Sequence, residues 1–101
     1  MANRLDLQAL FEEILESPNV YFQPPPSKRI EYDAIVFSIS NRRVRRANNS
    51  DYKHETAYEV IVIYRDPDSD LPQKIASLPM CSFDRHYTAD NLNHDVFTMY
   101  W

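Results

Sequence analysis

The segment Tyr58–Tyr64 carries apolar side chains on both faces of an extended chain, and this pattern limits the possible folds most strongly. Alternate side chains of a strand point to opposite faces. Here one face carries two valines between two tyrosines, and the other carries Ile61 and Ile63. A strand that is apolar on both sides is normally covered on both sides. We therefore expect a strand over about 57–65, at the centre of a sheet.

The first forty residues predict one helix and two further strands. Asn3 can cap a helix that ends near Ser17, before Pro18. The apolar residues of this helix follow the spacing of one buried face; they are Leu7, Leu10, Phe11, Ile14 and Leu15. The β-branched and aromatic run Val20–Phe22 predicts a short strand, and the alternation over Ala34–Ser40 predicts a longer one.

The polar stretch from Asn41 to Tyr52 joins the two longer strands and contains four arginines. Such a polar connection is read as a β-hairpin arm or a long loop that reaches away from the core.

The second half of the chain predicts a short helix and two closing strands. Asp70 and Gln73 resemble a capping pair for a helix that Pro79 ends; the apolar residues of this helix are Leu71, Ile75 and Leu78. Residues 81–87 and 95–101 then read as strands, with the polar segment 88–94 between them.

These elements predict an α+β fold in two layers. A mostly antiparallel sheet packs against the N-terminal helix and the second short helix. With 101 residues, a single domain over 1–101 is the expectation.

Composition excludes several classes of function. Glycine is absent, so no Gly-rich loop can cradle a nucleotide phosphate. A net charge of −4 argues against binding nucleic acid over the whole surface. The longest apolar run, Val60–Tyr64, is far shorter than the roughly 18 residues of a membrane span, so we expect no membrane association. A single cysteine, Cys81, excludes an internal disulfide and fits a reducing cytoplasm.

None of the candidate reactive groups matches the sequence pattern of a metal site or a catalytic site. Asp66, Asp68 and Asp70 have the first spacings of a calcium loop, but Pro67 and Leu71 break the pattern. A solvated turn that caps a helix explains them better.

Cys81 could be combined with a histidine, His86 or His94, and with a nearby carboxylate, but a strand cysteine is far more often a small buried apolar residue. The two histidines lack zinc-ligand spacing. We expect no catalytic residue, no metal, no cofactor and no enzymatic activity.

Two charged groups are candidate interface residues, namely the arginines Arg42, Arg43, Arg45 and Arg46 and the aspartates Asp66, Asp68 and Asp70. Four guanidinium groups so close together are stabilised by carboxylates or phosphate. Acidic groups of an identical neighbour, which include Glu12, Glu13, Glu16 and the three aspartates, could supply the carboxylates. A solvated edge strand that prevents aggregation is one alternative reading of the arginines, and an arm that faces DNA is another.

Several segments resemble small proteins encoded among the head-to-tail joining genes of siphophages and prophages of Gram-positive bacteria, the tail terminator family. They are Arg4–Leu10, Asn19–Pro25, Tyr58–Ile63 with Asp66–Ser69, Leu78–Arg85 and Thr88–His94. The resemblance covers nearly the whole chain but does not include the arginine stretch.

The resemblance implies a structural protein of the virion tail or neck, assembled in the host cytoplasm. Such proteins form a ring, typically a hexamer, at the end of the tail tube, stop the tube's polymerisation and dock to the head's neck. The implied partners are further copies of the chain, the major tail tube protein and a head-closure or neck protein, with DNA passing through the lumen. A head-closure or other neck connector protein is the alternative, and a small enzyme or regulatory protein is a distant third.

Overall fold

Strand β3 lies at the centre of a five-stranded sheet with the order β1-β2-β3-β5-β4, as its two apolar faces predict. The computed structural model describes residues 4–46 and 52–101. The elements are α1 (Arg4–Leu15), β1 (Val20–Phe22), β2 (Ala34–Arg46), β3 (Tyr52–Tyr64), α2 (Leu71–Ala76), β4 (Cys81–Ala89) and β5 (Leu92–Tyr100). Only the β1–β2 pair is parallel among the strand pairs in the described residues. The predicted α+β class with a mostly antiparallel sheet is confirmed.

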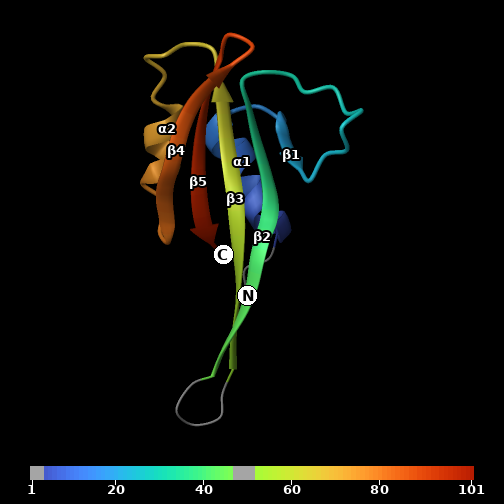
Figure 1. The fold of residues 1–101 in the computed structure, drawn as a ribbon, viewed down its shortest axis with the longest axis vertical. Coiled ribbons are helices and arrows are strands. Elements are labelled where there is room, and N and C mark those ends of the chain that lie inside the picture. Colours follow the sequence, from blue (N-terminus) through green and yellow to red (C-terminus); the bar gives the residue numbers. More distant parts are fainter. Residues whose placement is uncertain (1–3, 47–51) are drawn as a thin grey trace.

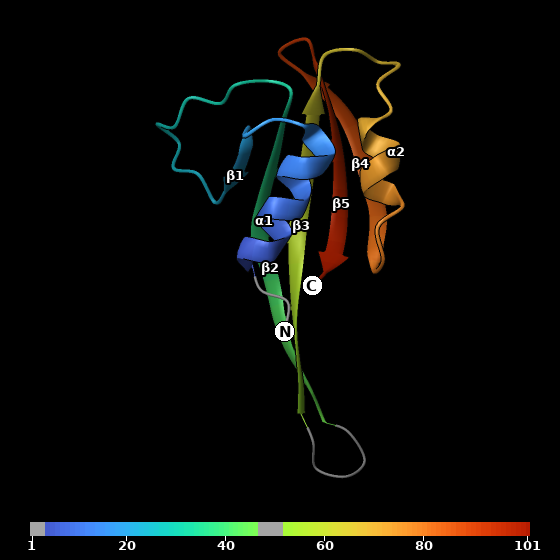
Figure 2. The same cartoon turned by 180° about the vertical axis from the view of Figure 1, so that it is seen from behind.

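Both helices cover the same face of the sheet (Figures 1 and 2). Leu7 and Phe11 of α1 and Ile75 of α2 are fully buried against it. The ring of Phe37 lies at the centre of an aromatic cluster, with its centroid 5.3 Å from that of Phe11 and 5.8 Å from that of Tyr58. The core is therefore a single layer of side chains between the helices and one face of the sheet.

Strands β2 and β3 continue well beyond the rest of the sheet. The pairing of β3 with β5 ends at Ala57, opposite Tyr100, whereas β2 and β3 remain paired as far as Arg46 and Tyr52. We call residues 41–46 and 52–56 the hairpin arm. It extends along the longest axis of the molecule, away from both helices (Figure 1). Of the two sequence readings, the structure has the hairpin arm.

The β4–β5 connection is much tighter than the predicted loop over 88–94. Both strands extend into that segment, so that Ala89 pairs with Leu92 and only Asp90 and Asn91 form the turn. Both turn residues have positive φ, 53° and 62°, as a two-residue hairpin of type I′ requires. Asp and Asn tolerate this conformation better than most residues, which lets the chain turn without glycine.

The predicted caps are only partly correct. Asp70 stands at the N-cap of α2 but makes no side-chain capping bond. Instead, the amide of Leu71 donates to the Ser69 hydroxyl at 3.2 Å. Helix α1 ends at Leu15, close to the predicted end at Ser17, and Asn3, its predicted cap, lies outside the described residues.

Substitution of two leucines in α1 tests how the core is packed. Leu7→Ala removes a fully buried side chain and should destabilise the protein by about 2–5 kcal/mol, because it leaves a cavity. Leu5 is 64% exposed on the same helix. Leu5→Ala should therefore change the free energy of unfolding by no more than about 0.5 kcal/mol. Urea denaturation of both variants measures the difference, and equal losses would contradict the described packing.

Candidate assembly surfaces

The two groups of predicted interface residues lie at opposite ends of the molecule. Arg42, Arg43, Arg45 and Arg46 all belong to the hairpin arm, where the structure describes the backbone. Asp66, Asp68 and Asp70 lie in the turn between β3 and α2, here called the acidic loop, at the end of the body far from the arm (Figure 1). One chain cannot bring the two groups together, so a contact between them requires a second copy.

Strand β4 forms a long outer edge of the sheet. Eight of its nine residues are exposed, and the backbone groups on its outer side have no strand beside them in the described part of the chain. Three large apolar residues on or beside this strand are exposed, namely Met80, Phe83 and Tyr87. Long exposed apolar edges normally pair with or pack against another chain.

A β-bulge interrupts this edge at Asp84. Phe83 pairs with Phe97 and Arg85 with Val96, which leaves Asp84 as the extra residue. Its carboxylate accepts a hydrogen bond from the Arg85 guanidinium at 2.7 Å. Bulges and charges of this kind limit uncontrolled strand pairing. The edge is thus protected against simple strand addition but keeps its apolar surface.

The sheet face opposite the helices, here called the open face, has no helix over it among the described residues (Figure 1). Helices therefore cover β3 on one side only, whereas its two apolar faces predict cover on both sides. One row of residues crosses it in register, from Tyr21 through Val36, Ile61 and Val96 to Arg85. Long side chains of β4 interact on this face, since the Arg85 guanidinium lies 6.0 Å from the Tyr87 ring centre and this ring stacks on His94 at 4.6 Å. The centre of the open face is apolar, and the side chains along β4 are aromatic and basic.

A hollow lies at the opposite edge of the sheet, beside β1. It has a volume of about 340 Å³ and lies between the start of α1, strand β1 and the proline-rich segment that follows it. Arg4 and Lys28 supply its positive charge, and Phe22, Pro24 and Pro25 supply apolar walls. We call this hollow the β1-edge pocket.

A polar cluster lies under the β4 edge, on the helix side of the sheet. The Tyr64 hydroxyl donates to Oδ1 of Asp95 at 3.1 Å, and Nδ1 of His86 makes a close contact with the same oxygen. Asp95 is the one buried charged residue among those the structure describes. Burial, the hydrogen bond to Asp95 and the charge of that carboxylate raise the pKa of Tyr64 to about 12. The cluster ties β3, β4 and β5 together.

Cys81 and the histidines do not form a nucleophile–base pair. Cys81 lies opposite Met99 and His86 opposite Asp95, five residues apart along β4, which is about 16 Å in a strand. Cys81 packs against the core, and burial raises the pKa of its thiol. His94 lies beyond His86 along the hairpin. A raised pKa makes the thiol less reactive, as expected for a packed residue.

The described residues contain no group of three or more His, Cys, Asp or Glu side chains placed to hold a metal ion. The acidic loop makes turn contacts instead, since the Asp68 amide donates to Oδ1 of Asp66 at 2.9 Å. Asp70 forms an exposed ion pair with Lys74 at 3.7 Å. None of the helices in residues 4–46 and 52–101 has the length and apolar character of a transmembrane segment.

Comparison with family models, with curated proteins and with solved structures finds no match to this chain.

Sequence reasoning missed the β1-edge pocket and the Tyr64–Asp95–His86 cluster. Nothing in the sequence indicates that Arg4 and Lys28 line the same pocket, because a helix start and a loop 24 residues later come to one edge of the sheet only in the folded chain. Asp95 gave a weak signal, since it is a charged residue in an otherwise apolar strand pattern.

The tyrosine of this cluster can be followed by alkaline titration at 295 nm. Tyr64 should ionise near pH 12, and Tyr64→Phe should remove that step. The unfolded chain ionises its tyrosines near pH 10. The stability contributed by the neutral hydroxyl is therefore complete below pH 10 and is lost as the pH rises towards 12. Asp95→Asn should lower the pKa of Tyr64, and an unchanged titration curve would show that Asp95 does not perturb it.

Proposed function

We propose that this protein is a structural assembly protein that forms a ring at the end of a siphophage tail tube, stops the tube's growth and docks to the head or neck. The observation that carries the proposal is the division of the surface into one projecting arm and two unlike sheet edges. The arm extends along the strand direction, whereas the edges lie on either side of it (Figure 1).

The two edges favour a ring over a symmetric pair. The β4 edge exposes Met80 and Phe83, and the β1 edge carries the pocket with Arg4 and Lys28. When two different surfaces of the same chain meet, the contact is heterologous and repeats from copy to copy. It closes into a ring when its rotation permits. Subunits joined edge to edge would leave the hairpin arm pointing out of the ring.

The hairpin arm fits a second contact, with the tube or with an adjacent copy. Its arginines give it a high local positive charge on a chain whose net charge is −4. Complementary charge of this kind steers association and fixes register between partners. The resemblance stated above gives the major tail tube protein and a head-closure or neck protein as further partners, with the mature protein in the virion.

A head-closure or other neck connector protein is the second candidate, favoured by the same features. Both roles need assembly surfaces and no reaction centre. They differ in which step of virion assembly fails without the protein.

Deletion of the gene from its phage separates the two candidates. A tail terminator mutant should produce normal DNA-filled heads together with unattached tails of excess or uncontrolled length, because nothing stops tube growth. Electron microscopy of the lysate measures tail length. Unattached tails of normal length would favour the neck protein instead, and attached tails of unchanged length would contradict both.

Reversing two charges of the arm tests its role in assembly. Arg43→Glu with Arg45→Glu should weaken assembly at low salt while leaving the body folded, because both residues lie in the arm, beyond the end of the β3–β5 pairing. The defect should depend on salt, since exposed charge pairs are screened. Arg29→Glu with Arg65→Glu changes the net charge equally on the exposed body and serves as the control.

Sedimentation of the variants at several salt concentrations, with and without tube protein, is the measurement. Unchanged assembly of the arm variant would remove the arm from the interface. Normal assembly combined with failed DNA retention would instead place the arm in the lumen.

A further inference from the structure

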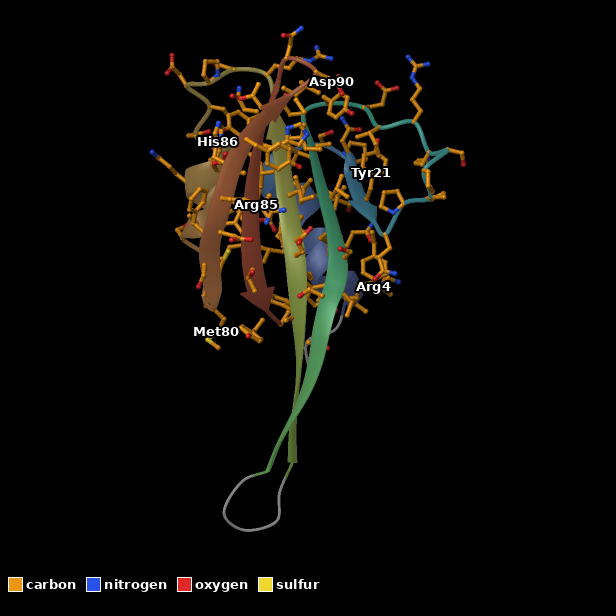
Figure 3. All side chains as sticks on the ribbon, viewed as in Figure 1. Arg4, Tyr21, Met80, Arg85, His86 and Asp90 are labelled. Carbon is orange, nitrogen blue, oxygen red and sulfur yellow. The ribbon has the colours of Figure 1, made fainter. Side chains whose placement is uncertain are left out.

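The β1-edge pocket holds two cations that are positioned by aromatic rings. The Arg4 guanidinium lies 4.5 Å from the centre of the Phe22 ring, and Nζ of Lys28 lies 5.8 Å from the centre of the Tyr21 ring. Arg4 also donates to Oε1 of Gln8 at 3.4 Å. Contacts of a cation with a ring face orient the side chain without neutralising its charge. Figure 3 shows Arg4 and Tyr21 together on this side of the sheet.

Neither cation has a carboxylate beside it in the part of the chain whose side chains the structure describes. Among the side chains of residues 4–40 and 56–101, no carboxylate lies within 4 Å of Arg4 or Lys28. The neighbouring Arg29 is different, because its Nε lies 3.8 Å from the Glu31 carboxylate outside the pocket. The hollow between the cations therefore suits an anionic group with an apolar or aliphatic stem.

The acidic loop carries negative charge, opposite to the positive charge of the β1-edge pocket. Asp66 and Asp68 are exposed, and the described Lys and Arg side chains all lie more than 4 Å from them. The turn is rigid for its length, since Pro67 fixes one φ angle and the Asp68 amide is bonded to Asp66. An ordered loop loses little conformational freedom when it binds.

The pocket and the loop lie on opposite sides of the molecule. The chain between β3 and α2 lies on the β4 side of the sheet in both views, and β1 lies on the other side (Figures 1 and 2). A chain therefore cannot place its own acidic loop in its own pocket, whereas a second copy can. The same side of the sheet also carries the exposed Met80 and Phe83, at the end of β4 away from the acidic loop (Figure 3).

We propose that the β1-edge pocket binds the acidic loop of a second copy, with Asp66 and Asp68 of one subunit beside Arg4 and Lys28 of the next. This contact is heterologous, and it identifies the surfaces that join neighbours in the ring, so it rests on the proposed function. It assigns Asp66 and Asp68 to contacts between subunits and leaves the hairpin arm available for the tube.

Single charge reversals test the contact. Lys28→Glu should weaken self-association by about tenfold or more at low salt, because it faces the acidic loop with like charge. Arg29→Glu is the matched control, since it changes the next residue by the same charge outside the pocket, and it should associate normally. On the other surface, Asp68→Lys should weaken association, and Glu31→Lys should not.

Mixing the variants gives the decisive result. Lys28→Glu and Asp68→Lys proteins should each assemble poorly alone and assemble together, because every contact in an alternating ring then joins opposite charges. Sedimentation velocity on each protein and on the mixture measures this, and circular dichroism confirms that both variants are folded.

The outcomes separate this inference from the proposed function. If the unaltered protein forms rings and Lys28→Glu does so equally well, the pocket contact is wrong while the ring stands. If both variants fail alone and the mixture also fails, the two residues do not face each other. If the unaltered protein stays monomeric even with tube protein, the ring itself is wrong.

Discussion

The packing of both helices against one face of the sheet is the constraint on which the other features depend. Phe11, Phe37 and Tyr58 fill the layer between α1 and the sheet, and Ile75 of α2 extends it towards β5. Both helices of the described residues lie on this one face, so no helix covers the sheet edges, the open face or the hairpin arm in that part of the chain. Surfaces left uncovered by a small core are those through which such a chain can meet others.

Because the chain contains no glycine, other residues must adopt positive φ where the backbone turns. Within residues 4–46 and 52–101, five residues adopt positive φ without being glycine, namely Glu16, Gln23, Met80, Asp90 and Asn91. Asp and Asn accept this conformation readily, whereas for Met and Glu it is uncommon and normally costs free energy. Met80 stands where the chain enters the β4 edge, and its side chain is 62% exposed. The strained backbone and the exposed apolar side chain coincide at the edge to which we assign a subunit contact.

Unlike charges are separated across the molecule. The β1 side carries Arg4 and Lys28 held over aromatic rings, and the opposite side carries the acidic loop. The net charge of −4 hides this separation, because a sum over the chain does not show where the charges lie. The Tyr64–Asp95–His86 cluster lies just inside the β4 edge. Its hydrogen bonds hold that edge in one register, which a repeated contact between subunits requires.

The sequence by itself determined the α+β class, the central place of the strand that ends at Tyr64, and the helix face that contains Leu7 and Phe11. Each follows from the periodicity of apolar residues over a short stretch, which neighbouring residues alone can specify. It did not determine the lengths of β4 and β5, because Asp90 and Asn91 form a turn that polar composition cannot distinguish from a longer loop. Only the tertiary structure decided that Arg4 and Lys28 line one pocket and that Asp95 accepts a hydrogen bond from Tyr64. These contacts join residues far apart in sequence, and their geometry is set by strand order and register, which no local pattern encodes.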